Sequence, residues 1–179
     1  MRLFIALDLD ERVKEYLGYL QRVIHLPGDK LSLSSGFHIT LKFLGEVSEE
    51  RLEALRGSLR GIDFNELKLK TSGVGVFRRK GKVSVVWAGI EPKKEVEDLY
   101  RKIEDTLVEE GFDRDRRFHP HVTIARVKYL SDKKRFVYNL KKIEKKEIHM
   151  SVKSFAIFRS HLTSQGPIYS VVEKFWASK

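Results

Sequence analysis

The stretch "GFHITLKFLGE", from Gly36 to Glu46, decides the fold because its apolar and polar residues alternate. One parity holds Phe37, Ile39, Leu41 and Phe43, and the other holds His38, Thr40 and Lys42. Successive side chains of a β-strand point to opposite faces, so one of these two sets enters a core. We therefore predict a half-buried strand whose open face carries a histidine, a threonine and a lysine.

A second stretch, "FHPHVTIA" from Phe118 to Ala125, repeats this alternation. Its tetrapeptide "HVTI" begins at His121 and matches the "HITL" that begins at His38: histidine, aliphatic, threonine, aliphatic. In a strand the histidine and the threonine of each tetrapeptide point the same way. A weak internal repeat with one short signature is what a duplicated, two-lobed fold would give.

These residue types suit chemistry on a phosphate ester. An imidazole titrates near neutrality, and a threonine hydroxyl can donate a hydrogen bond to an anion. If the two pairs faced each other, one of His38 and His121 could deprotonate a water while the other protonated the leaving oxygen. Thr40 and Thr123 would then hold the non-bridging oxygens, and this arrangement needs no metal.

Composition limits the class of protein. The chain has 179 residues, 35 Lys and Arg against 25 Asp and Glu, and a formal net charge of +10. This excess suits an acidic partner such as RNA, DNA, a nucleotide or an anionic membrane, or it simply keeps the protein soluble. The absence of cysteine excludes disulfides and thiolate metal ligands. The high charge, the lack of cysteine and the few amide side chains also fit a thermophile.

The first residues are too acidic for a signal peptide, and no apolar run approaches the roughly 20 residues of a membrane span. We therefore expect a monomeric cytoplasmic protein that makes no membrane contact. Helix caps, breakers and periodicity predict a single bilobal α+β domain over residues 1–179, with antiparallel sheets around a central cleft and helices outside. The expected strands are 2–9, one around His38, 67–77, 82–90, 118–127, 148–158 and 168–175, and the expected helices are 11–24, 48–59 and 92–110, with a turn or short helix at "SDKKRF".

Each histidine also has a simpler interpretation. A lone strand histidine is usually a surface or hydrogen-bonded residue, and we assign that role to His25, His149 and His161. His119 and His121 share a face and could ligate zinc, but the sequence offers no obvious third ligand at the right spacing. We interpret Lys42 as a charge on the rim of the site.

The two blocks resemble the 2H phosphoesterase superfamily, which is defined by two His-x-Thr-x motifs. Within it, the chain is most similar to the RNA 2′,3′-cyclic phosphodiesterase family, also called 2′-5′ RNA ligase-like. The resemblance covers nearly the whole chain through "RLFIALDLDERVKEYL", "FHITLKFLGEV", "GVGVF", "VVWAGIE", "FHPHVTIAR" and "SFAIFRSHLTSQGPIYSVVEKF".

The resemblance implies two pseudo-symmetric lobes and hydrolysis of RNA 2′,3′-cyclic phosphate ends, including tRNA-derived ends, to a 2′-phosphate and a free 3′-OH, without metal, ATP or another cofactor. It implies that His38 and His121 are catalytic and that Thr40, Thr123 and Arg126 contact phosphate. In a regular strand Arg126 would point away from His121, so its role requires a bulge or a strand end there. We predict His121 as the base and His38 as the acid.

Two other functions compete with hydrolysis. The same pocket could join tRNA halves through a 2′-5′ bond, and the sequence does not separate the two activities. A non-catalytic RNA-binding module would need aromatic residues on an open sheet, and the chain has no matching motif. Three basic segments could follow the RNA backbone or remain solvated: Phe77 to Lys82, Arg114 to Arg117 and Lys141 to Lys146.

Overall fold

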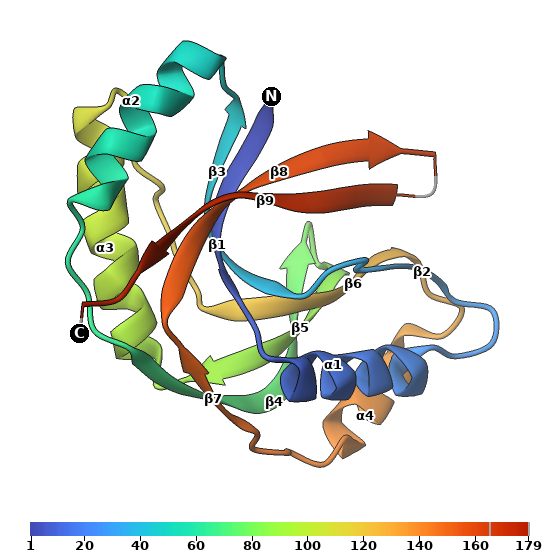
Figure 1. The fold of residues 1–179 in the computed structure, drawn as a ribbon. Coiled ribbons are helices and arrows are strands. Elements are labelled where there is room, and N and C mark those ends of the chain that lie inside the picture. Colours follow the sequence, from blue (N-terminus) through green and yellow to red (C-terminus); the bar gives the residue numbers. More distant parts are fainter. Residues whose placement is uncertain (165, 179) are drawn as a thin grey trace.

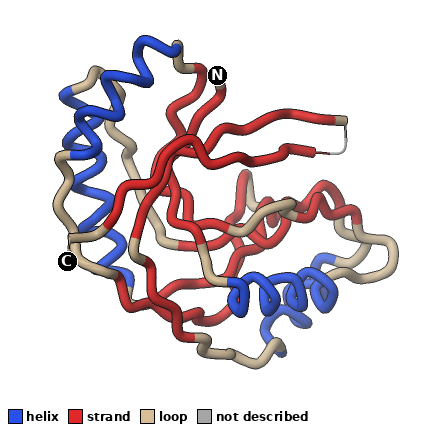
Figure 2. Tube along the Cα trace, viewed as in Figure 1, coloured by secondary structure: helices blue, strands red, loops and turns tan. Residues whose placement is uncertain are grey.

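The computed structural model of the protein describes residues 1–164 and 166–178, and within these ranges the chain forms nine strands and four helices (Figures 1 and 2). In chain order they are β1 (Arg2–Asp8), α1 (Glu11–Ile24), β2 (Lys30–Leu33), β3 (His38–Glu46), α2 (Glu49–Arg60), β4 (Leu67–Arg79), β5 (Lys82–Glu91), α3 (Lys93–Glu109), β6 (His121–Tyr129), α4 (Lys133–Lys142), β7 (His149–Val152), β8 (Ser154–Thr163) and β9 (Gly166–Trp176).

The strands form two antiparallel sheets, and part of the order of strands and helices occurs twice along the chain. The four-stranded sheet has the order β3-β1-β8-β9, and the five-stranded sheet has the order β2-β6-β5-β4-β7. Apart from β2, which lies between α1 and β3, the unit β1-α1-β3-α2 corresponds to β5-α3-β6-α4. In each unit the strand that carries the His-x-Thr motif pairs with the strand that precedes the first helix of the unit. The prediction of an α+β fold with two pseudo-symmetric lobes is confirmed.

The helices cover the outside of the two sheets. Asp10 and Ser48 begin α1 and α2, because each side chain accepts a hydrogen bond from a backbone N–H in the first turn. In Figure 1, α2 and α3 lie together along one side, next to the four-stranded sheet, while α1 and α4 lie below the five-stranded sheet. The faces of the sheets that the helices leave open are available to form a site.

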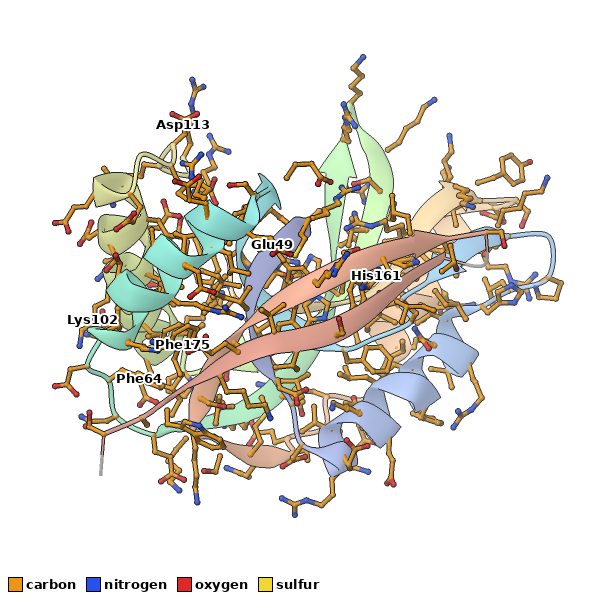
Figure 3. All side chains as sticks on the ribbon, turned by 45° about the horizontal axis from the view of Figure 1, so that its top comes forward. Glu49, Phe64, Lys102, Asp113, His161 and Phe175 are labelled. Atoms are coloured by element: carbon orange, nitrogen blue, oxygen red, sulfur yellow. The ribbon has the colours of Figure 1, made fainter. Side chains whose placement is uncertain are left out.

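One hydrophobic core runs through both sheets. Its members include Leu7 and Ile39 from the four-stranded sheet and Val122 from the five-stranded sheet, all fully buried. Phe155 packs at 4.9 Å from Phe175 and 5.5 Å from Phe64, two residues labelled beside the α2–α3 layer in Figure 3. Because the core is shared, the positions of the two motif strands are fixed relative to each other.

The structure differs from the local predictions in three places. The sequence did not predict β2, which pairs with the edge of β6. The single strand expected over residues 148–158 is two strands, because β7 pairs with β4 in one sheet while β8 pairs with β1 in the other. Residues 159–167, which lie between two of the expected strands, are mostly a continuation of the β8–β9 hairpin and not a loop. Gln165, within this segment, lies outside the described residues.

Candidate active site

Both motif strands carry a β-bulge at the fourth residue of the motif. In β3 the neighbouring strand pairs with Thr40 and then with Lys42, which leaves Leu41 extra; in β6 the pairing passes from Thr123 to Ala125 and leaves Ile124 extra. A bulge turns the following side chains to the opposite face. The first six residues of both strands therefore have the same burial pattern. The motif histidine and threonine are half-buried, the second, fourth and fifth residues are buried, and the sixth residue is exposed.

The open faces of the two sheets meet at a cleft of about 510 Å³. This volume lies within the range of about 300–1,000 Å³ that is common for small-ligand sites. The cleft is lined by all five residues singled out from the sequence, which are His38, Thr40, His121, Thr123 and Arg126. The two His-x-Thr pairs therefore reach one cavity from separate lobes.

His38 lies against an aromatic cluster on the cleft face of the four-stranded sheet. Its ring is 4.8 Å from Phe4, 5.2 Å from Tyr169 and 6.1 Å from Phe158, centroid to centroid. Burial in this surrounding lowers the pKa of His38 from 6.5 to about 4, while Asp8 opposes the shift and His121 adds to it. Within the cleft, His38 is therefore a neutral imidazole at pH 7.

His121 is oriented by its own backbone. Its Nδ1 lies 2.6 Å from the carbonyl oxygen of His119, and because a carbonyl can only accept, Nδ1 carries the proton and donates it. The unprotonated nitrogen of the neutral ring is therefore Nε2. Burial lowers the pKa of His121, and the charge of Arg126 adds to this, whereas the carbonyl hydrogen bond opposes it. An edge-to-face contact with Phe77 at 4.8 Å supports the ring.

A glycine keeps room for the aromatic residues behind His121. Trp87 on β5 packs 4.9 Å from His119, and its ring lies against the backbone of Gly75 on β4. A side chain at Gly75 would overlap the Trp87 ring. The position therefore requires glycine for close approach rather than for a special backbone angle.

The bulges place Arg126 on the cleft face and correct two interpretations from the sequence. Arg126 lines the cleft with His121 because Ile124 is the extra residue before it. By the same shift in β3, Phe43 leaves the core and lines the cleft with 66% of its surface exposed. Lys42 turns inward and is buried, with 4% of its surface exposed. It is not a rim charge.

The buried Lys42 ties β3 to the segment that leads into β6. Its ammonium lies 2.8 Å from the carboxylate of Glu104 on α3 and 3.1 Å from that of Asp115. It also donates a 2.6 Å hydrogen bond to the carbonyl of Asp113, which follows α3 at the top of Figure 3. Glu104 in turn accepts from the backbone N–H of Asp115 at 2.8 Å. This network connects the two motif strands through α3.

The other charged residues are distributed unevenly. Arg2, which was not predicted, lines the cleft, and so does Phe77 at the start of one basic segment. Residues 114–117 are not among the described residues that line the cleft, and Arg114 forms an ion pair with Asp105. Lys142, Lys145 and Lys146 instead line a separate hollow next to α1 and α4.

The remaining histidines do not enter the cleft, and its further lining comes from segments that the motifs do not mark. His161 lies exposed on β8, where Figure 3 labels it. The rings of His119 and His121 are 6.1 Å apart, and the described residues contain no group of three or more His, Cys, Asp or Glu side chains placed to hold a metal ion. The lining that the sequence did not predict includes Ser32, Ser34, Leu162 and Tyr169.

The sequence of this chain matches a known family. The model of the 2′-5′ RNA ligase superfamily matches residues 10–163. A protein of Methanocaldococcus jannaschii named RNA 2′,3′-cyclic phosphodiesterase is 33% identical over 98% of this chain and 100% of its own length. Proteins of the same name from Archaeoglobus fulgidus and Thermotoga maritima are 34% and 35% identical, over 98% and 96% of this chain and 99% and 93% of their own lengths.

Solved structures show the same fold. The crystal structure of TT0787 of Thermus thermophilus matches with a TM-score of 0.81 and 27% identity, over 98% of this chain and 97% of the other. Escherichia coli LigT complexed with 3′-AMP matches with a TM-score of 0.81 and 24% identity, over 99% and 98% of the two chains. The chain belongs to the 2′-5′ RNA ligase superfamily, a family of enzymes. None of the helices in the described part of the chain has the length and the apolar composition of a membrane span.

Proposed function

We propose that the protein hydrolyses 2′,3′-cyclic phosphate ends of RNA to a 2′-phosphate and a free 3′-OH, with His38 and His121 as the acid–base pair. The observation that carries the proposal is that two His-x-Thr pairs, one from each lobe, line a single cleft. Each pair stands at the same position relative to the bulge in its strand. The relatives named RNA 2′,3′-cyclic phosphodiesterase support the choice of substrate.

The reaction follows from the positions of these groups. One histidine takes a proton from water as the water oxygen attacks phosphorus, and the bond from phosphorus to O3′ breaks. The other histidine gives a proton to O3′, so that the charge stays balanced. Thr40 and Thr123 donate hydrogen bonds to the non-bridging oxygens, and Arg126 offsets the added negative charge. The protein's own side chains supply every group that this step uses.

The tautomer of His121 supports its role as the base. Because Nδ1 donates to the carbonyl of His119, Nε2 keeps a lone pair that can accept a proton from water. His38 is then the acid, and the anionic ester raises its low pKa on binding. A diester with a 4-nitrophenol leaving group needs no proton donor. His38→Ala should therefore retain more activity on it, relative to wild type, than His121→Ala; the reverse result would exchange the roles.

The direct test uses a short RNA that ends in a 2′,3′-cyclic phosphate, with EDTA present throughout. We expect turnover by the wild type and a loss of about 10²- to 10⁴-fold in kcat for His38→Ala and for His121→Ala. His161→Ala is the matched control, because His161 is exposed and lies outside the cleft. Turnover that stops with EDTA would contradict a mechanism that depends on the histidines alone.

Two other functions would give different results in the same experiment. If the protein joins ends, adding an RNA with a 5′-OH should yield a longer product with a 2′-5′ bond, and this product should disappear with the same two histidine variants. If the protein only binds RNA, the wild type should show affinity without turnover. The two intact motifs favour an enzyme, since binding alone does not require two histidines.

A further inference from the structure

The two motif strands belong to different sheets, so no ladder of backbone hydrogen bonds joins β3 to β6 in the described part of the chain. The shared core packs them together, but apolar contact has no preferred direction. His38 and His121 must nevertheless stand at a fixed separation, because both act on one phosphorus in the proposed reaction. An error of about 1 Å in such a geometry can cost about 10²-fold in rate. Directional contacts between the two strands can therefore affect catalysis without touching the substrate.

Lys42 makes directional contacts of this kind. It stands on β3 four residues after His38, and its side chain crosses to the segment between α3 and β6. Its ammonium donates a 2.6 Å hydrogen bond to the carbonyl of Asp113 and lies 3.1 Å from the carboxylate of Asp115. The chain reaches His121 six residues after Asp115. Lys42 therefore connects the strand of one histidine to the segment that leads into the strand of the other.

Helix α3 holds the same segment in place. Glu104 has one carboxylate oxygen 2.8 Å from the Lys42 ammonium, and its other oxygen accepts a 2.8 Å hydrogen bond from the N–H of Asp115. One turn earlier on α3, the ring of Tyr100 stacks on Phe118, with the centroids 3.9 Å apart and an angle of 6° between the planes. Phe118 is three residues before the motif histidine of β6. Ion pairs, hydrogen bonds and a stacked ring therefore fix this segment before β6 begins.

Stability alone does not explain a buried charge at this position. Replacing a buried ion pair by apolar residues of similar volume is often neutral or stabilising. Ala125, which occupies the corresponding fifth position of β6, is apolar and fully buried, so the other lobe accepts such a residue there. Lys42 and Glu104 add direction, because a hydrogen bond weakens steeply as its angle departs from linear. Their contacts therefore suit a role in setting geometry.

We propose that Lys42 is a positioning residue, which sets the separation of His38 and His121 through its contacts with the segment before β6. This inference rests on the paired acid–base hydrolysis proposed above. Lys42 is buried and is not among the described residues that line the cleft, so it acts through the histidines and not on the ester. Its loss should lower kcat more than it raises KM. The groups that bind the phosphate stay in the cleft, while the two histidines no longer meet the ester together.

The test uses the double variant with Lys42→Met and Glu104→Leu, which replaces both buried charges and leaves neither of them unpaired. Its melting temperature should therefore lie well above that of Lys42→Met alone. With a short RNA that ends in a 2′,3′-cyclic phosphate, we expect kcat to fall at least about tenfold and KM to change less than about threefold. With bis(4-nitrophenyl) phosphate, which needs a base but no proton donor, the loss in kcat should be several times smaller. A purely structural role of Lys42 would lower both rates alike.

Two further variants keep the test decisive if the double variant folds poorly. The side chain of Asp115 is 49% exposed, so Asp115→Ala removes one contact of Lys42 with little effect on folding. It should lower kcat on the cyclic ester by about threefold or more, again with a smaller loss on the nitrophenyl ester. Leu59→Ala is the matched control, because Leu59 lies on α2, is fully buried and is not among the described residues that line the cleft. The cavity it leaves lowers the melting temperature, but kcat should stay at the wild-type value wherever this variant is folded.

The outcomes separate the two proposals. If the wild type does not hydrolyse the cyclic ester, the proposed function fails and this inference fails with it. If the wild type hydrolyses it, but the double variant and Asp115→Ala keep the wild-type kcat or lose it equally on both esters, the hydrolysis stands and only the positioning role of Lys42 is overturned. A loss in Leu59→Ala as large as in the double variant would also overturn that role, because the rate would then follow stability alone. If the wild type does not turn over the nitrophenyl ester, this comparison with Leu59→Ala decides.

Discussion

The imidazole of His38 lies 4.8 Å from the ring of Phe4, centroid to centroid, on a cleft face that Phe158 and Tyr169 complete. A protonated imidazole loses hydration in such a place, and this loss lowers the pKa of His38 to about 4. The aromatic residues that hold the His38 ring in place therefore also determine its protonation state. The pKa of His121 is also below its ordinary value, mainly through burial.

These two shifts predict the pH dependence of the reaction. The profile of kcat/KM reports the free enzyme, so it should be bell-shaped, with one limb near pH 4 and the other below pH 6.5. The bound ester is an anion and favours imidazolium, so both limbs of the kcat profile should move to higher pH. Initial rates between pH 3.5 and 9 would check this. A flat profile from pH 5 to 9 would argue against paired acid–base catalysis.

Removing a ring from the aromatic cluster around His38 should raise the pKa of His38 towards its ordinary value. Tyr169 is half-buried and its ring lies 5.2 Å from His38, so Tyr169→Ala admits water to the imidazole. We expect the pKa of His38 to rise from about 4 towards 6.5, as measured by NMR titration of labelled histidine. Tyr129→Ala removes an equally large ring that lies outside the cleft lining, and it should leave this pKa in place. An unchanged pKa in Tyr169→Ala would mean that Tyr169 does not contribute to the desolvation.

The motif threonines should affect kcat more than stability. Thr40→Val and Thr123→Val keep the branched shape but remove the hydroxyl that would face the non-bridging oxygens. Removing one such donor typically costs about 10²- to 10³-fold in kcat. We expect losses in this range for each variant in steady-state assays, with melting temperatures close to the wild type. If either variant kept full activity, its threonine could not be a transition-state contact.

The buried Lys42–Glu104 pair should contribute to stability in a way that depends on both partners. Lys42→Met leaves the carboxylate of Glu104, which is 1% exposed, without its cation. Such a change typically costs about 3–5 kcal/mol in the free energy of unfolding. Replacing both partners, with Lys42→Met and Glu104→Leu, should recover much of this loss. Urea unfolding of Lys42→Met, Glu104→Leu and the double variant would measure this, and losses that simply add in the double variant would show that the pair is not coupled.

The sequence predicted the strands that carry the motifs and most of the helices, because the information there is local. The alternation around His38 and His121 specifies which face the histidines and threonines occupy, and the caps Asp10 and Ser48 specify where two helices begin. The division of the 148–158 segment between two sheets was not predictable in this way. No glycine or proline interrupts the segment, and the break depends on which distant strand each half pairs with.

Which face of the sheet the residues after each motif occupy also depends on the pairing with a strand that is distant in the sequence. Alternation alone puts Phe43 in the core and Lys42 on the surface. The structure has the opposite, because β1 pairs with Thr40 and then with Lys42, which leaves Leu41 as an extra residue. The same shift in β6, made against β5, brings Arg126 to the cleft. Nothing within either strand marks the extra residue. One signal was available only by comparing the two strands, because Phe43 and Arg126 stand at the same offset from their histidines.

The cations of the cleft and those of the distant hollow should differ in their effect on RNA binding. Arg2 lines the cleft, whereas Lys145 lines the hollow next to α1 and α4. For single strands, each phosphate contact contributes about −0.7 to the slope of log K against log salt. Arg2→Gln should therefore reduce the slope by about 0.7 for an RNA ending in a 2′-phosphate, which is not turned over, while Lys145→Gln should leave it unchanged. Fluorescence anisotropy between 50 and 300 mM salt would measure both slopes. Equal reductions in the two variants would mean that the RNA extends to the hollow, and no reduction in either would mean that the cleft cations serve solubility rather than binding.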